Sequence, residues 1–221
     1  MRNVKAWIWG AVLLVLLAPV AWAAPSGKVV VAQGVDPTTL DPHDHEETPA
    51  YNVLLNLYDT LLVRDKDLKI IPWLATSYKL VNPTTWEFKL RQGVKFHNGE
   101  GFDAEVAKYS LERLANPALN LRMTALRVID RVEVKDKHTI HIITKKPYPT
   151  LAAQLALRGA MVPPAYFKDK DKAHLARNPL GTGPFKFVKW VKDEQIELEA
   201  NEQYWKGAPK IKTLIFRPIP E

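Results

Sequence analysis

The sequence predicts an α+β fold in which a mixed sheet is flanked by helices. Stretches that alternate apolar and polar residues, typical of strands, are interleaved with amphipathic helical stretches, and no regular β-α-β rhythm is present. Seventeen prolines favour short strands separated by many loops. Apolar residues make up 47% of the chain, which is enough for a hydrophobic core, and we find no internal repeat.

The first 23 residues have the three parts of a secretory signal peptide. Arg2 and Lys5 form a basic start, residues 6–18 are apolar, and Ala21-Trp22-Ala23 matches a cleavage signal. A membrane-spanning helix needs about 20 apolar residues, and this run is shorter and ends at a proline, so cleavage is favoured over an uncleaved anchor. We therefore expect a mature chain that begins near Ala24 and is soluble and exported, most simply to the periplasm.

Composition narrows the classes of protein further. Cysteine is absent, so disulfides, thiolate metal ligands, a cysteine nucleophile and a lipid-modified N-terminal cysteine are excluded. Removing Arg2 and Lys5 leaves 29 basic and 24 acidic residues, which lowers the formal charge from +7 to +5. This excess is mild and spread along the chain, so no nucleic-acid partner is expected.

The first half of the expected mature chain predicts strands around one helix. Residues 28–34 are rich in strand-forming residues, and residues 50–62 repeat apolar side chains at helical spacing. In residues 85–91 apolar side chains alternate with polar and charged ones, as in a half-buried strand. Residues 93–99 are expected to form a second strand that ends in an Asn-Gly turn.

The second half predicts helices, a hairpin and short strands. Asp103 is a good N-cap for a helix over residues 104–114. Residues 130–145 are expected to form a hairpin that turns at Asp136 and Lys137. The remaining expected elements are a helix over 149–157, a turn or short helix over 163–168, and strands over 185–191, 195–200 and 211–219.

Six stretches in a fixed order carry a family resemblance. They are Leu40–His43 (LDPH), Asn56–Leu62 (NLYDTLL), Pro72–Tyr78 (PWLATSY), Trp86–Leu114, Gly181–Trp190 (GTGPFKFVKW) and Leu198–Ile211 (LEANEQYWKGAPKI). Together they resemble the solute-binding proteins of peptide, nickel and opine ABC importers, called family 5. The resemblance implies a type II periplasmic-binding-protein fold, whose two lobes close on a small solute and deliver it to a membrane permease complex. No cofactor is implied.

The sequence differs in length from the family that it resembles. Family members are more than twice as long, and their second lobe and both hinge crossings follow the point where this sequence stops. Residues 24–221 therefore resemble the first, N-terminal lobe, with the second lobe missing. Closure needs contacts from both lobes, so tight capture by this lobe alone is not expected, and a truncated product or fragment is favoured over a partner that supplies the rest.

The expected function is that of a periplasmic substrate-binding component of an ABC importer for short peptides or similar small solutes. The full-length protein would be a monomer that passes its ligand to the permease. The alternatives are a truncated remnant without a transport role and a module that binds another protein through the exposed lobe face. A metal-binding receptor of the nickel type is a further alternative.

Two candidate ligand segments follow from the resemblance. In oligopeptide-binding members a segment shortly after the L-D-P motif lies extended along the cleft and pairs with the ligand backbone, which here corresponds to Glu46, Glu47 and Thr48. Arg122 and Met123 fall where family members carry cleft-lining residues, and an arginine there could pair with a ligand carboxylate. The alternative for Arg122 is a surface position on a short helix.

Metal binding is the competing interpretation of the same loop. His43 and His45, with the two glutamates that follow, are chemically able to ligate a metal ion. Such sites need three or four convergent ligands, however, and side chains two residues apart point the same way only if the loop is a true strand. His43 also lies inside the L-D-P-H pattern, where a structural role is expected. Tyr51, at the start of the next helix, is expected to pack in the core, and the alternative is that it faces the cleft.

The remaining motifs favour structural roles, and no enzyme is predicted. Gly181 and Gly183 lack the Lys-Ser/Thr ending of a phosphate-binding loop, so we expect them to allow a tight turn with positive φ. Trp86, Trp190, Tyr204 and Trp205 are expected to be framework residues. No G-x-S-x-G or H-E-x-x-H motif is present. The best enzyme alternative is a metal-dependent hydrolase that uses His43 and His45.

Overall fold

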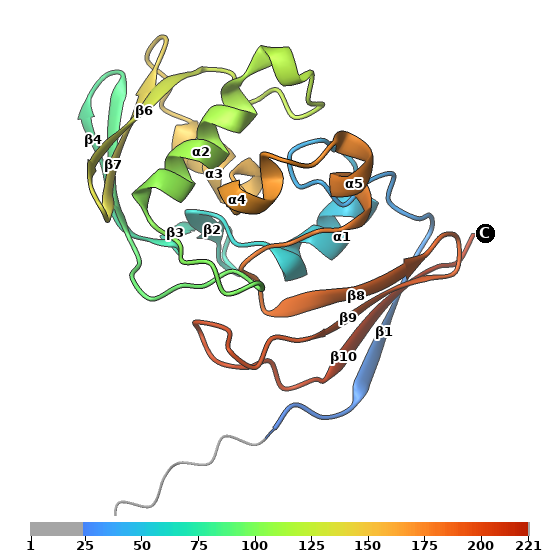
Figure 1. Cartoon of the computed structure of the whole chain (residues 1–221). Helices are drawn as coiled ribbons and strands as arrows, with labels where there is room; N and C mark the ends of the chain where they lie inside the picture. The colour runs from blue at the N-terminus through green and yellow to red at the C-terminus, as the bar shows by residue number, and fades with distance from the viewer. Residues whose placement is uncertain (1–23, 221) are drawn as a thin grey trace, which may run out of the picture.

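The computed structural model describes residues 24–220, which form two four-stranded sheets with helices packed between and beside them (Figure 1). The first sheet has the order β1-β10-β9-β8, in which β1 is parallel to β10 and the other pairs are antiparallel. Its strands are β1 (Lys28–Gln33), β8 (Phe185–Val191), β9 (Gln195–Ala200) and β10 (Thr213–Pro218).

The second sheet is fully antiparallel and has the order β4-β5-β7-β6. Its strands are β4 (Ala75–Asn82), β5 (Thr85–Leu90), β6 (Ile129–Asp136) and β7 (Thr139–Thr144). A short ladder of β2 (Leu62–Arg64) and β3 (Ile70–Pro72) lies between the sheets. The helices are α1 (Thr48–Leu57), α2 (Ala104–Ala115), the 3-10 turn η1 (Pro117–Leu119), α3 (Leu151–Arg158), α4 (Pro164–Phe167) and α5 (Lys172–Arg177).

Each sheet has its own hydrophobic core. In the first core α1 packs on the sheet that contains β8 to β10, through residues such as Val53, Leu57 and Ile196. The second core lies between the β4-β5-β7-β6 sheet and helices α2 and α3, and includes Phe88 and Leu111. Because the chain passes from one core to the other directly after α1 and again after α3, these two crossings bring distant segments together.

The helix signal at Asp103 is confirmed in detail. The Asp103 carboxylate accepts hydrogen bonds from the backbone N–H groups of Glu105 and Val106, at 3.1 and 3.2 Å. This satisfies two of the N–H groups that a helix start leaves without partners. The predicted inward face of α2 is also confirmed, since four residues on it are buried: Val106, Ser110, Leu111 and Leu114.

Most predicted elements are confirmed, and three differ from the structure. The helix expected over residues 50–62 ends at Leu57, because Tyr58 adopts extended backbone and the chain turns into β2. The strand expected over residues 93–99 is wrong: this segment makes only one isolated bridge, from Lys95 to Gly101. The hairpin turns at Lys137 and His138, one residue later than predicted.

The two glycines of the GTGPF segment have a different role from the predicted one. Neither is among the glycines with positive φ. Instead, a Cβ on Gly181 would lie 2.1 Å from the Leu57 carbonyl oxygen, and one on Gly183 would lie 2.5 Å from the Leu57 carbonyl carbon. The Gly183 N–H donates to that same Leu57 oxygen at 2.9 Å. Close backbone approach at the end of α1 therefore requires glycine at both positions.

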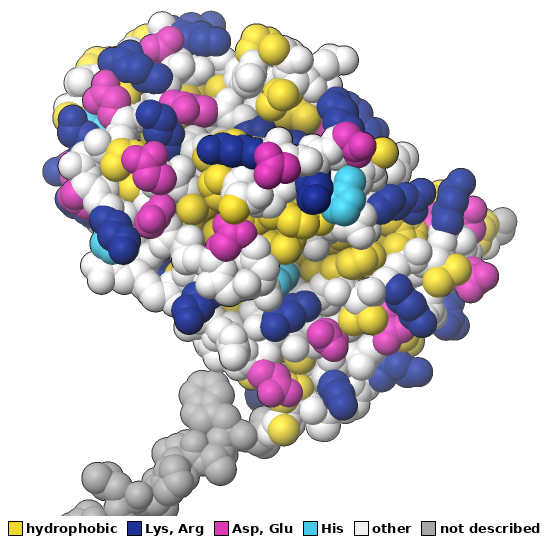
Figure 2. Space-filling view, in the orientation of Figure 1, with side chains coloured by type: hydrophobic (Ala, Val, Ile, Leu, Met, Phe, Trp, Pro, Cys, Tyr) yellow, Lys and Arg dark blue, Asp and Glu magenta, His cyan; other side chains and the backbone are white. Residues whose placement is uncertain are grey.

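Two observations concern export and surface charge. The predicted signal peptide, residues 1–23, lies outside the described residues. Within residues 24–220, no helix is both long enough and apolar enough to cross a membrane. Figure 2 shows basic and acidic side chains intermixed over one face of the molecule, with no stripe of a single sign on that face.

Candidate functional site

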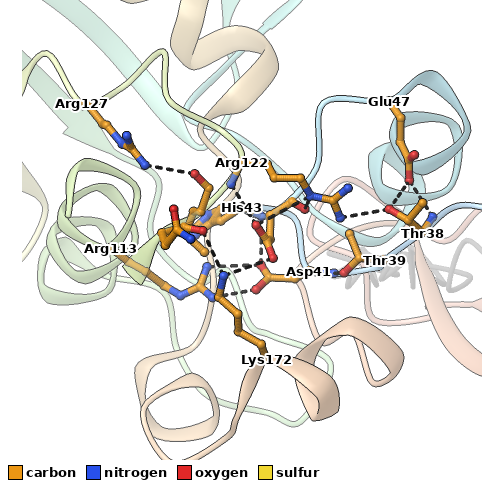
Figure 3. A network of polar contacts seen from close by, with 12 residues as sticks. Thr38, Thr39, Asp41, His43, Glu47, Arg113, Arg122, Arg127 and Lys172 are labelled. Atoms are coloured by element: carbon orange, nitrogen blue, oxygen red, sulfur yellow. Dashed lines mark hydrogen bonds and ion pairs between the residues drawn. The ribbon is translucent and has the colours of Figure 1, made fainter. Parts of the chain in front are cut away.

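The loop of residues 38–47, which leads from β1 into α1, is held first by a buried ion pair. Asp41 is 2% exposed, and its carboxylate accepts two hydrogen bonds from the Arg113 guanidinium of α2, at 2.7 and 3.2 Å (Figure 3). Burial alone would raise the pKa of Asp41, but the Arg113 charge outweighs it and the pKa lies below its ordinary value. Both side chains of the pair are buried and are joined by two hydrogen bonds, so the pair anchors the loop to α2.

His43 anchors the same loop to the segment after α3. It is fully buried, and its Nε2 lies 2.8 Å from the carbonyl oxygen of Ala160. Burial lowers the pKa of His43 to about 3, so the ring is neutral at neutral pH and Nε2 carries the proton that it donates. Within the described part of the chain no three His, Asp or Glu side chains converge on a metal site, so nothing in this geometry supports a metal role for His43 and His45.

Arg122 and Glu47, two of the predicted ligand residues, both hold the loop in place. Arg122 donates from Nε to the Asp44 carbonyl at 2.7 Å and from Nη2 to the Thr38 hydroxyl at 3.0 Å (Figure 3). Glu47 accepts hydrogen bonds from the Thr38 backbone N–H and hydroxyl, at 2.6 and 2.8 Å. In this structure their polar atoms are largely used within the protein.

Thr48 and Met123 are placed less favourably for ligand contact than predicted. Thr48 is the exposed first residue of α1, so the extended backbone needed for strand addition ends at Glu47. Met123 is 1% exposed and belongs to the second core. A contact between either side chain and a ligand stays a prediction, and the structure gives Met123 no accessible surface for it.

Glu46, the remaining predicted residue, belongs to a group that the structure assembles from three elements. Glu46 pairs with Arg158 at the end of α3, at 3.3 Å, with 40% and 24% of the two side chains exposed. Tyr51 of α1 packs against the ring of His45, with ring centroids 4.3 Å apart. We call these four residues, His45, Glu46, Tyr51 and Arg158, the α1–α3 corner.

The α1–α3 corner contains buried polar atoms that have no partner. The Nδ1 of His45, the hydroxyl of Tyr51 and the Nε of Arg158 are all buried without a hydrogen bond. Buried polar groups in folded proteins nearly always have partners, so three orphans in one place mark a polar cluster that the protein itself leaves unsatisfied. Burial lowers the pKa of His45 and raises the pKa of Tyr51, so both side chains are neutral at neutral pH and Arg158 supplies the positive charge.

Sequence reasoning missed Arg158. Tyr51, which was expected to pack in the core, does pack against the second core and also contacts His45. Arg158 ends the apolar helix Leu151–Arg158 and precedes a glycine, where a basic residue is usual because it favours the negative end of the helix dipole. Its partner Glu46 lies 112 positions away in the chain. No local pattern in the sequence therefore points to this pair.

Comparison with known proteins defines the class. The family model described as "Bacterial extracellular solute-binding proteins, family 5 Middle" matches residues 69–221. The chain therefore belongs to family 5 of the bacterial extracellular solute-binding proteins, which confirms the resemblance predicted from the six sequence stretches.

Individual relatives show the same relationship. The chain is 35% identical over 220 residues to the glutathione-binding protein GsiB of Pectobacterium atrosepticum, covering 97% of this chain and 42% of the relative. Among solved structures, NikZ from Campylobacter jejuni in complex with Ni(L-His) aligns with a TM-score of 0.80 and 28% identity, over 88% of this chain and 40% of NikZ. DppA from Helicobacter pylori in complex with the peptide STSA aligns with a TM-score of 0.79 and 29% identity, over 89% and 43%.

These alignments confirm the fold class. The chain spans about two fifths of the length of these relatives. Its mixed α/β architecture corresponds to a single lobe of a periplasmic binding protein, as the sequence predicted.

Proposed function

We propose that residues 24–221 form the first lobe of the periplasmic substrate-binding component of an ABC importer, and that the α1–α3 corner is this lobe's part of the ligand site. The observation that carries the proposal is the group of three buried, unpartnered polar atoms beside the Glu46–Arg158 pair. The ligand is a short peptide or a similar small polar solute. Similarity to proteins named for glutathione, a peptide and Ni(L-His) supports this choice.

The chemistry of the corner favours a carboxylate of the ligand. Arg158 donates from Nη1 to Gln154 and from Nη2 to Glu46, which leaves Nε free. The Tyr51 hydroxyl is a second free donor. A carboxylate could accept from both, and charge-assisted bonds to arginine are stronger than neutral ones. Glutathione, a peptide and histidine each carry a carboxylate.

The other residues have supporting roles in this proposal. Glu46 is 40% exposed, so it can attract a ligand amine when a ligand carboxylate takes its place on Arg158. Glu47 and Arg122 act by holding loop 38–47, and Thr48 lies at the exposed edge of the site. The role is binding and not catalysis, and it needs no cofactor.

For the full-length protein we further propose export, closure of a second lobe and delivery to the permease. A signal peptide over residues 1–23 directs export, and a second lobe closes over the ligand by a hinge motion. The full-length protein acts as a monomer that delivers its ligand to the membrane permease. A lone lobe contributes only half of the contacts, so its own affinity is expected to be low.

The experiment that tests the corner is a titration of the purified protein with reduced glutathione, followed by NMR because NMR detects weak binding. Arg158→Gln should weaken binding by at least about tenfold, since an arginine–carboxylate contact contributes roughly 1.5–3 kcal/mol. Arg131→Gln is the matched control, because Arg131 lies on β6 and pairs with Asp130 and Glu133. Equal binding by wild type and Arg158→Gln would refute the assignment of the site.

A further inference from the structure

A hollow of about 510 Å³ opens beside the α1–α3 corner. It lies between α1, α3, the β2–β3 ladder and the segment of residues 204–206, and these helices and strands are neighbours in the centre of the fold (Figure 1). The volume is within the range of small-molecule sites, which is about 300–1,000 Å³. None of the predicted ligand residues lines it.

The walls of the hollow are mostly apolar. Leu55 of α1 is 56% exposed and Leu157 of α3 is 38% exposed, although both are large hydrophobic residues. Single exposed leucines are common on protein surfaces, but here two of them line one concavity. Val63, Ile71 and Trp73 complete the apolar wall. The hollow therefore suits an apolar group that would lose contact with water on entering.

The carboxylate of Asp59 lies at the floor of the hollow, and hydrogen bonds from the protein occupy its acceptor positions. Asp59 is 4% exposed and accepts four hydrogen bonds from side chains. The donors are Trp73 Nε1 at 2.7 Å, Thr182 Oγ1 at 2.9 Å, the Tyr204 hydroxyl at 2.9 Å and Trp205 Nε1 at 3.1 Å. A carboxylate has about four acceptor positions, so Asp59 has no remaining site for a ligand donor and instead fixes the aromatic walls.

The hollow and the α1–α3 corner lie on the same two helices, although no residue of the corner lines the hollow. Leu55 follows Tyr51 by four residues on α1, and side chains at this spacing are about 5–6 Å apart. Leu157 directly precedes Arg158 on α3. A ligand held by its carboxylate at Arg158 therefore has its nearest side chain close to the mouth of the hollow.

We propose that this hollow is a subsite for the apolar side chain that neighbours the ligand's carboxylate. The inference rests on the proposed function, and it narrows the ligand class to short peptides or amino-acid derivatives with a free carboxylate beside an aliphatic or aromatic side chain. The charged corner on the same two helices favours a ligand as occupant over an apolar residue of another protein segment.

The test compares two dipeptides that share a free carboxylate, glycyl-leucine and glycyl-glycine, by NMR titration of the purified protein. The indole N–H of Trp73 is a local reporter, because Trp73 lines the hollow. Wild type should bind glycyl-leucine at least about fivefold more tightly than glycyl-glycine, and only glycyl-leucine should shift the Trp73 signal. Glycyl-leucine amide, which lacks the carboxylate, should bind more weakly than glycyl-leucine.

Substitutions distinguish the contribution of the subsite to binding from that of the α1–α3 corner. Leu157→Ser and Leu55→Ser should each reduce the preference for glycyl-leucine to less than about twofold while leaving glycyl-glycine binding unchanged. Leu80→Ser is the matched control, because Leu80 is an equally exposed leucine on β4, and it should change nothing. Arg158→Gln should weaken both dipeptides.

Three outcomes would overturn the inference. Equal binding of the two dipeptides, with both weakened by Arg158→Gln, would remove the subsite and leave the proposed function intact. A preference for glycyl-leucine that survives both leucine substitutions would place the apolar contact elsewhere. Absence of binding by either dipeptide and by glutathione would remove the subsite and the proposed function together.

Discussion

Two of the arginine–carboxylate pairs on loop 38–47, Arg113–Asp41 and Arg158–Glu46, differ in burial and in how fully their hydrogen-bonding groups are used. The Arg113–Asp41 pair is 7% and 2% exposed, has two hydrogen bonds, and is surrounded by packed residues. The Arg158–Glu46 pair is 24% and 40% exposed, has one contact at 3.3 Å, and leaves the Nε of Arg158 without a partner. A saturated pair stabilises the fold, whereas an unsaturated one can still exchange its partner for a ligand.

The largest expected effect is at the saturated pair. Asp41→Asn leaves the buried Arg113 charge without a counter-charge, and breaking a buried pair in this way costs about 3–5 kcal/mol. Urea unfolding of the variant should therefore show a midpoint far below that of wild type at an unchanged slope. A loss below about 1 kcal/mol would mean that Arg113 finds water or another acceptor, and the contrast between the two pairs would then fail.

The second expected effect is a pH dependence at His43, which joins the same loop to Ala160. The pKa of His43 lies at about 3 in the fold, below its ordinary value of 6.5, so the unfolded chain binds the proton more readily. The stabilisation is complete above about pH 6.5 and is lost as the pH falls toward 3, with a slope of up to about 1.4 kcal/mol per pH unit.

The control for this prediction is a variant that keeps the donor but cannot titrate. His43→Gln should flatten the fall in unfolding free energy between pH 6.5 and pH 4.5, measured by urea unfolding. His97 is also buried with its pKa lowered to about 4, so it contributes a fall of the same sign in both proteins. The difference between wild type and variant isolates His43, and identical pH profiles would show that His43 does not contribute.

The smallest expected effect on stability is at the unsaturated pair. Glu46→Gln removes a partly exposed, single-contact ion pair, and such pairs contribute about 0–1 kcal/mol. Thermal unfolding should therefore change little, while binding of a peptide with a free amine should weaken. A loss of stability as large as that of Asp41→Asn would mean that the α1–α3 corner is structural.

The same contrast explains what could be predicted from sequence. Asp103 and the alternating strands act through neighbours a few residues away, so their patterns were visible, and the six family stretches located loop 38–47. The partners of His43 and Glu46 lie 117 and 112 positions away in the chain, so no local pattern could reveal either contact. Residues 93–99 have strand-forming composition, but no neighbouring strand offers them a ladder beyond one bridge.

The glycines at positions 181 and 183 have a consequence for how ligand preference can change. They hold the end of α1 through contact between backbone atoms, so the position of this helix does not depend on the side chains that it presents to solvent. Leu55, which is 56% exposed, can therefore be exchanged for another residue without moving the helix that carries it. On the proposed function, a side chain of α1 that contacts the ligand can change while the helix that carries it stays in place.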